Sequence, residues 1–142
     1  MPYPSYDRYR STVAQVLVVE DDADSRDALC KMLTRKGYAV DCVGNGRAAL
    51  LSVLKSIPDV VVLDLSLPEM DGAKLLEIMR SYLRLQSLPV IVWTGMIGNP
   101  IVDRATEFHV EAVIGKGKSD FSDLLAAVRH TLESSPQKPG EC

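Results

Sequence analysis

The chain has 142 residues, which suits a single domain, and its 46% apolar and 25% charged residues are ordinary for a globular protein. The formal net charge is −3, and no cluster of Arg or Lys offers a basic surface for the phosphate backbone of a nucleic acid. Direct nucleic-acid binding is therefore not expected. No apolar run approaches the roughly 20 residues that span a bilayer, and the polar N-terminus lacks a signal peptide's apolar stretch, so a cytoplasmic location without membrane contact is expected.

The first part of the chain alternates between strand and helix patterns. Residues 1–13 are polar, rich in Tyr and Pro, and are predicted to form a flexible arm. A strand over 16–19 leads to a helix over about 24–36, which Gly37 is expected to end as the residue after the C-cap. A shorter, more polar strand over 38–43 suits the edge of a sheet.

The next helix and strand follow the same alternation. Asn45 is predicted to cap a helix that buries Ala48, Leu51 and Leu54 and stops before a proline. Residues 60–63 read VVVL without polar alternation, which predicts a strand buried on both faces, as in a parallel sheet.

The second half of the chain is predicted to add three helices and two strands, so one domain is expected over residues 14–134. Five alternations of strand and helix predict an α/β protein with a parallel sheet and helices on both faces. Residues 135–142 contain two prolines and a glycine and are predicted to be a disordered tail. The remaining elements are a helix over 72–83 with Leu75, Leu76 and Met79 inside, a strand over 88–94, a helix from Pro100 to about Phe108 capped by Asn99, a strand over 112–115, and a last helix capped by Ser119 or Asp120 with Phe121, Leu124, Leu125, Val128 and Leu132 in one stripe.

The three cysteines form no CxxC motif and no Cys/His pair with metal-ligand spacing. Cys30 falls in a predicted helix and Cys42 in a predicted strand, where both are expected to be inert, buried apolar side chains of a protein in a reducing compartment. Cys142 falls in the predicted tail and is assigned no function.

Polar residues stand where four of the five predicted strands end. Glu20 and Asp21 end the first strand, Asp64 the third, Thr94 the fourth and Lys116 the fifth. Taken singly, each has a structural explanation, such as an Asx-turn for Asp64 or a solvated loop for Lys116. Because the strands of a parallel sheet point the same way, their carboxyl ends share the edge where open α/β sheets bind ligands. Three acids, a hydroxyl and an ammonium group are therefore expected to converge on one cleft.

With these markers in order, the chain resembles a receiver domain of the two-component response regulators. The markers are the Glu20–Asp21 pair after VLVV, Asp64 followed by LSLPEMDG, Thr94 and Gly95 after PVIVW, and Lys116 after AVIG. The resemblance covers about residues 14–134. It implies a flavodoxin-like, doubly wound five-stranded parallel sheet of order 2-1-3-4-5 with five helices.

The resemblance also implies that Asp64 accepts a phosphoryl group from the phosphohistidine of a sensor kinase or from a phosphotransfer protein. Repulsion among clustered carboxylates is relieved by a hard divalent ion with oxygen ligands, which is Mg²⁺ or alternatively Mn²⁺. The implied direct ligands are Asp21, Asp64 and the backbone carbonyl of Ser66, with Glu20 acting through water.

The remaining site residues are given switching roles by the same resemblance. Lys116 would pair with the carboxylate at rest and with the phosphoryl group afterwards, and Thr94 would hydrogen-bond a phosphoryl oxygen. The protein is accordingly expected to be no enzyme, but a phosphoprotein switch that assists its own Mg²⁺-dependent phosphorylation and dephosphorylation.

Three departures from the family pattern concern how the signal is read. The family usually has an aromatic switch residue where this chain has Val113, whose stiff, short side chain cannot swing as a ring can. Gly117 replaces the usual proline after the active lysine, and no effector domain follows the last helix. A stand-alone receiver is therefore expected, signalling through the face formed by residues 99–134 to an unknown downstream protein or to a second copy in a homodimer.

Two other functions compete with this interpretation. A pseudo-receiver, which would be an interaction module without phosphate cycling, is favoured by Val113 and Gly117 and opposed by the intact acids, Thr94 and Lys116. A hydrolase of the haloacid dehalogenase type needs a second Asp two residues after the nucleophile, where this chain has Ser66, and a cap domain for which the chain is too short.

Overall fold

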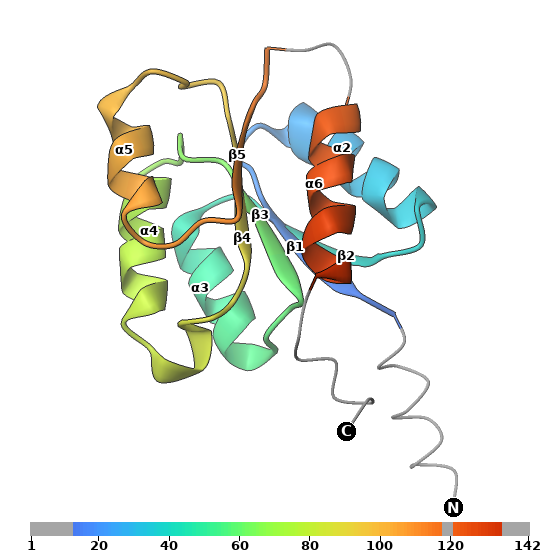
Figure 1. Ribbon diagram of the computed structural model, residues 1–142, viewed down its shortest axis with the longest axis horizontal. Coiled ribbons are helices and arrows are strands. Elements are labelled where there is room, and N and C mark those ends of the chain that lie inside the picture. The colour runs from blue at the N-terminus through green and yellow to red at the C-terminus, as the bar shows by residue number, and fades with distance from the viewer. Residues whose placement is uncertain (1–12, 118–120, 135–142) are drawn as a thin grey trace, which may run out of the picture.

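A five-stranded parallel sheet forms the centre of the protein (Figure 1). The structure, a computed structural model, describes residues 13–117 and 121–134. The strand order β2-β1-β3-β4-β5 confirms the predicted doubly wound topology. The strands are β1 (Gln15–Val19), β2 (Ala39–Val43), β3 (Val60–Leu63), β4 (Val90–Thr94) and β5 (Ala112–Gly115).

Helices cover both faces of this sheet, with α2 and α6 on one face and α3, α4 and α5 on the other (Figure 1). The predictions for the N-terminal arm, for a cap at Ser119 or Asp120 and for the C-terminal tail fall on residues outside the described ranges, apart from residue 13. Within those ranges no helix has both the length and the apolar character needed to cross a bilayer. The helices are α2 (Ala23–Arg35), α3 (Gly46–Lys55), α4 (Gly72–Arg80), α5 (Pro100–Thr106), α6 (Ser122–Glu133) and a short 3₁₀ turn, η1 (Leu83–Leu85).

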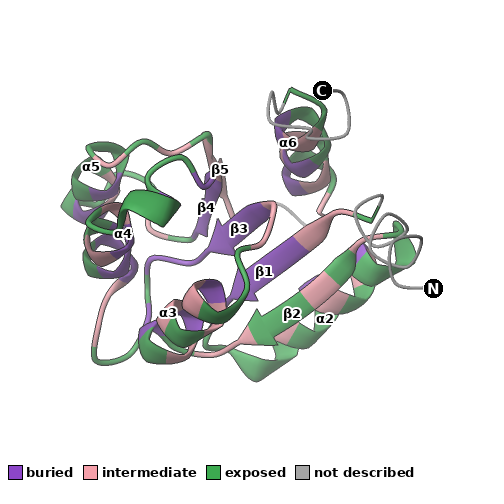
Figure 2. Cartoon of the chain, turned by 90° about the horizontal axis from the view of Figure 1, so that it is seen from below, coloured by how far each residue is buried: buried purple, intermediate pink, exposed green. Residues whose placement is uncertain are grey.

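The central strands are buried on both faces, as the unbroken apolar run of residues 60–63 predicts (Figure 2). Successive side chains of a strand point to opposite faces, so each strand feeds two cores. In β1, Val16 and Val18 join the core under α2 and α6, whereas Leu17 and Val19 join the core under α3, α4 and α5. The edge strand β2 is half-buried or exposed throughout.

The inner face of α3 differs from the prediction. Asn45 caps the helix as expected, because its Oδ1 accepts the backbone N–H of Ala48 at 2.8 Å. The helix buries Ala49 and Val53, however, and leaves Leu51 63% exposed. The segment is apolar on more than one side, so more than one set of residues has helical spacing, and packing on the sheet decides between them.

The α4 helix ends at Arg80, three residues before the predicted end. Leu75, Leu76 and Met79 are buried as expected. Arg80 donates hydrogen bonds to the carbonyl oxygens of Leu85, Phe108 and His109 at 2.7, 2.8 and 2.7 Å. These bonds hold the η1 turn and the segment after α5 against α4, a long-range contact that local sequence does not reveal.

The expectation of inert thiols is wrong for Cys30 and Cys42, which form a disulfide. Helix α2 packs beside β2, and the two Cα atoms are 6.7 Å apart, within the span that a disulfide bridges. A separation of 12 residues matches no short cysteine motif, so the pairing depends on the packing of helix on strand. A disulfide is also unusual in a reducing compartment. Cys142 lies outside the described residues.

Gly72 lets the loop after β3 approach the start of α4. A Cβ at this position would lie 2.6 Å from the Leu65 Cα and 2.8 Å from the Asp64 carbonyl oxygen, both of which are backbone atoms. We expect Gly72→Ala to lower the free energy of unfolding by about 2–3 kcal/mol, because the backbone must shift to admit the methyl group. Urea denaturation measures this loss. Gly117→Ala is the matched control, since a Cβ there meets nothing within 4 Å, and an equal loss in both variants would contradict the explanation.

Candidate functional site

The site lies where the strand order reverses, at the carboxyl ends of β1 and β3. From β1 the chain moves outward to β2, and from β3 it moves the other way to β4 and β5, which leaves a crevice at this edge. Glu20 N–H donates to the carbonyl of Val43 and Asp64 N–H to the carbonyl of Val19, both at 3.0 Å. The hydrogen bonds of the sheet thus continue to the first residue beyond each strand and fix the backbone positions of both acids.

Three carboxylates meet in this crevice, as predicted. One oxygen each of Glu20, Asp21 and Asp64 lies within 4.8 Å of the others. Glu20 is 1% and Asp64 4% exposed, whereas Asp21 is exposed to solvent. Oxygen ligands of this type suit a hard divalent cation, which can enter from solvent because Asp21 is exposed. The donor set therefore fits Mg²⁺.

Lys116 reaches into this cluster from the end of β5. Its Nζ donates to Glu20 Oε1 at 2.6 Å and to Asp64 Oδ2 at 2.9 Å. The ammonium group thus joins the two buried acids, while the second oxygen of Glu20 accepts the backbone N–H of Asp22 at 3.1 Å. The lysine side chain is 24% exposed, so one end of the ion-pair network opens to solvent.

Burial and charge shift the protonation equilibria of this network. Burial is the main cause that raises the pKa of Glu20, and the charge of Asp64 raises it further, against the lowering effect of hydrogen bonds from Lys116 and Asp22. Burial lowers the pKa of Lys116, but hydrogen bonds and charges from both acids outweigh it and raise that pKa above its ordinary 10.5. The raised pKa keeps the Lys116 ammonium group charged, and the stabilisation that this group contributes is lost as pH rises through that raised pKa.

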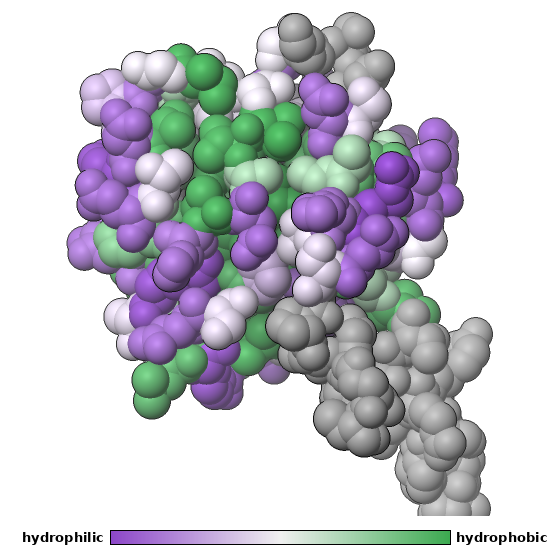
Figure 3. All heavy atoms as spheres, in the orientation of Figure 1, coloured by the Kyte–Doolittle hydropathy of each residue, from purple (hydrophilic) through white to green (hydrophobic). Residues whose placement is uncertain are grey.

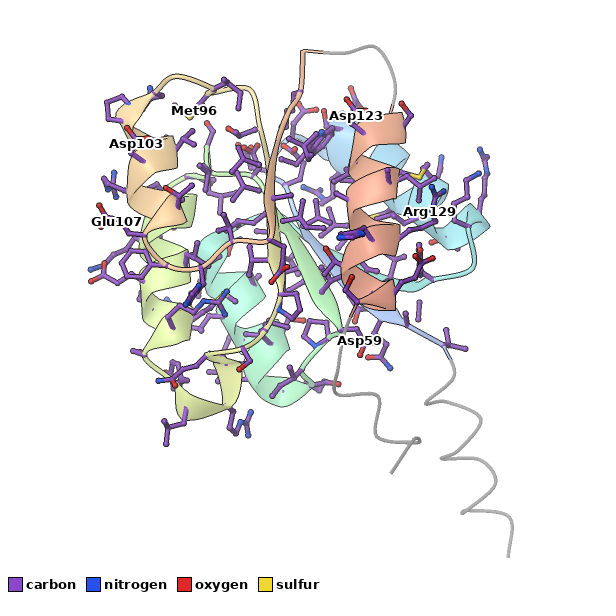
Figure 4. The ribbon with its side chains drawn as sticks, in the orientation of Figure 1. Asp59, Met96, Asp103, Glu107, Asp123 and Arg129 are labelled. Carbon is purple, nitrogen blue, oxygen red and sulfur yellow. A yellow bond between two sulfur atoms is a disulfide. The ribbon has the colours of Figure 1, made fainter. Side chains whose placement is uncertain are left out.

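Thr94 closes β4 at the same edge and is fully buried. Its Oγ1 accepts the backbone N–H of Met96 at 3.0 Å, and its carbonyl oxygen accepts the N–H of Lys116 at 2.9 Å. A hydroxyl that accepts one hydrogen bond can still donate another. Thr94 thus connects the strand end that carries Lys116 with the loop that carries Met96, which is labelled in Figure 4.

Ser66 and Val113 have less direct relations to the cluster. The Ser66 N–H donates to Asp64 Oδ1 at 3.1 Å, which places this residue beside the acid. Val113 pairs with Val92 in the sheet and packs, half-buried, on the core under α3, α4 and α5. The ligand role of the Ser66 carbonyl and the switch role of Val113 stay predictions.

Two residues at the site were not predicted from the sequence. Arg26 of α2 donates from Nη1 to the carbonyl oxygens of Glu20 at 2.9 Å and Asp21 at 3.4 Å. The centroid of the Trp93 ring lies 4.7 Å from Lys116 Nζ. An arginine in a first helical turn and an aromatic residue in a strand are both ordinary, so neither gives a signal without the fold.

The known proteins that this chain resembles belong to one family. The family model for the response regulator receiver domain matches residues 16–129. Response regulator ArlR of Staphylococcus aureus is 32% identical over 126 residues, which cover 89% of this chain and 56% of ArlR. The chain therefore spans about half the length of the curated relatives that it matches.

Solved structures agree with this match. The signal receiver domain of a signal transduction histidine kinase from Syntrophus aciditrophicus is 29% identical, with a TM-score of 0.79 over 88% of this chain and 94% of that one. The receiver domain of a sensor histidine kinase from Pseudomonas aeruginosa has the same TM-score of 0.79 at 21% identity, over 86% of this chain and 99% of that one. That second likeness shows the fold alone; the Pseudomonas protein holds a magnesium ion in its active site cleft.

Proposed function

The chain belongs to the family of response regulator receiver domains, and on this premise we propose that Asp64 is the phosphoryl acceptor of a two-component signalling switch. One observation carries the proposal. The Lys116 ammonium group bridges Asp64 and Glu20 inside a cluster of three carboxylates at the topological switch point of the sheet. A buried acid with a direct cationic partner at this edge is suited to receive an anionic group whose charge must be neutralised.

In the proposed transfer, a carboxylate oxygen of Asp64 attacks the phosphorus atom of a phosphohistidine. A new O–P bond forms while the P–N bond breaks, and the imidazole nitrogen keeps the electron pair and takes a proton from solvent. Lys116 would then move from the Asp64 carboxylate to a phosphoryl oxygen, and Thr94 would donate its hydroxyl hydrogen to another. Both shifts follow the negative charge as it moves from the carboxylate to the phosphoryl group.

Receiver domains bind Mg²⁺ at an acidic site, and the carboxylates here form such a site. Asp21, Asp64 and the Ser66 carbonyl would hold Mg²⁺, or Mn²⁺ in its place, with Glu20 acting through water. The bound ion would neutralise charge on the transferring phosphoryl oxygens. Receiver domains are signalling switches, and we propose that this chain assists its own phosphorylation and dephosphorylation through these groups.

Incubation with Mg²⁺ and acetyl phosphate, followed by intact-mass measurement, tests the proposal. We expect the mass of one phosphoryl group to appear only when both reagents are present. A protein that gains no mass would instead act as a pseudo-receiver. Val113 and Gly117 are the departures that favour that outcome, and the intact acids, Thr94 and Lys116 oppose it.

The face formed by α5, β5 and α6 is the proposed exit for the signal. Apolar side chains gather between α5 and α6 over β5 on this side (Figure 3), and β5 is half-buried along its whole length. The segment after α5 is held by the hydrogen bonds from Arg80, whereas Ile97 in the loop before α5 is 59% exposed. Movement at Thr94 would therefore pass first into the loop before α5 and from there to this face.

We expect phosphorylation to change backbone NMR shifts along the described part of residues 99–134, because the switch moves an existing equilibrium of this face. Spectra with and without acetyl phosphate, in the presence of Mg²⁺, measure the effect. Changes confined to the crevice would contradict the proposed exit. The proposed donor is a sensor histidine kinase or a phosphotransfer protein, and the proposed reader is a downstream protein or a second copy of the chain.

A further inference from the structure

Trp93 lies in β4 directly before Thr94 and is 8% exposed. Its side chain belongs to the core under α2 and α6. The ring centroid is 4.7 Å from Lys116 Nζ and 5.5 Å from the centroid of Phe121, with an angle of 58° between the two aromatic planes. Among the described residues, the Lys116 ammonium group thus contacts two carboxylates and one aromatic ring.

The backbone around Lys116 does little to fix the lysine side chain. Gly115 and Gly117 flank it, and a Cβ added to Gly117 would meet nothing within 4 Å. β5 is the last strand of the sheet, and within the described residues the backbone of Lys116 is held by the hydrogen bond from its N–H to the Thr94 carbonyl oxygen at 2.9 Å. The position of the ammonium group therefore depends on what its own side chain contacts.

The contact with Asp64 must change during the proposed transfer, because the lysine follows the charge from that carboxylate to the phosphoryl group. The ring contact need not change, since Trp93 sits in the sheet, is packed in the core and is supported by the tilted ring of Phe121. The negative face of an indole attracts an ammonium group within about 6 Å, and more strongly where water is partly excluded. Lys116 satisfies both conditions at 4.7 Å and 24% exposure.

We propose that Trp93 is a positioning residue, whose ring keeps the Lys116 ammonium group at the acceptor carboxylate and thereby increases the rate of Asp64 phosphorylation. The inference rests on the proposed function of Asp64 and Lys116. The ring touches neither the acceptor nor the donor, so it acts through the lysine alone. Its effect should follow the presence of an aromatic face and not the volume of the side chain.

The test compares Trp93→Leu and Trp93→Phe in the full chain at saturating Mg²⁺, with the initial phosphorylation rate measured against acetyl phosphate concentration. We expect Trp93→Leu to lower the maximal rate about five- to tenfold, which matches the usual strength of a partly buried cation–π contact. Trp93→Phe should recover most of the rate. Ile91→Ala is the control, because Ile91 is buried in the same strand and the same core as Trp93 but lies two residues farther from the carboxyl end of β4, where the site is.

Each outcome decides a different point. Equal rates for Trp93→Leu and the wild type would overturn the positioning role, as would a rate loss in Ile91→Ala that matches the one in Trp93→Leu at equal thermal stability. A wild type that takes up no phosphoryl group would overturn the proposed function itself, and this inference with it. Should the variants not fold, the wild type still gives a test, because a ring at 4.7 Å must shift the Lys116 side-chain proton resonances upfield, and unshifted resonances would contradict the contact.

Discussion

Replacing Asp64 with alanine is expected to abolish phosphoryl uptake from acetyl phosphate, whereas the wild type gains one phosphoryl mass in the presence of Mg²⁺. Asp64 is the buried acid at the end of the central strand β3, and Lys116 bonds to it directly at 2.9 Å. A methyl group offers no oxygen to attack phosphorus, so no covalent intermediate can form at this position. Glu20 keeps its bond to Lys116 in the variant, but it follows a different strand and does not take over the acceptor's place.

Intact-mass measurement before and after incubation gives the answer directly. Asp103→Ala is a matched control, because Asp103 is an exposed acid on the outer side of α5, away from the crevice (Figure 4). We expect this control to be phosphorylated to the wild-type extent. A phosphoryl mass that persists in Asp64→Ala would assign the acceptor to another residue.

Replacing Lys116 with methionine is expected to destabilise the protein without metal and to make its stability strongly dependent on Mg²⁺. Removal of one partner from a buried ion pair costs about 3–5 kcal/mol, and the partial exposure of Lys116 reduces this to roughly 2–3 kcal/mol. Two buried carboxylates then face Asp21 without a compensating charge. Added Mg²⁺ supplies that charge and no longer competes with the ammonium group, so it should raise the melting temperature more in the variant than in the wild type.

Thermal unfolding with and without Mg²⁺ measures this difference. Lys74→Met is the matched control, because the exposed pair of Lys74 and Glu77 at 3.4 Å contributes little to stability. An equal Mg²⁺ effect in Lys116→Met and the wild type would show that the ammonium group and the metal do not share one site.

The sequence predicted those parts of the fold that depend on local patterns. The unbroken apolar run of residues 60–63 predicted a strand buried on both faces. The polar residues Glu20 and Asp64 marked where β1 and β3 end. The convergence of Glu20, Asp21 and Asp64 follows from a general property of parallel sheets, that their carboxyl ends lie together. The strand order was implied only by the family resemblance.

The remaining features depend on which surfaces meet. The face of α3 that is buried, the early end of α4 and the Cys30–Cys42 disulfide all arise from contacts between segments that are distant in the chain or ambiguous in their spacing. The pairing of Lys116 with Glu20 as well as Asp64, and the ring of Trp93 beneath the ammonium group, arise in the same way. Periodicity gives the face of a strand, but not the partner that a side chain will meet.

Trp93 is the single tryptophan among the 142 residues. Light that excites indole but not tyrosine therefore yields emission from one place in the molecule, 4.7 Å from the charge that is proposed to move. When the ammonium group exchanges the Asp64 carboxylate for a phosphoryl oxygen, the electric field across the indole changes, and with it the wavelength and intensity of the emitted light. The protein thus carries a built-in optical reporter of its own lysine, which needs no dye, no label and no added residue.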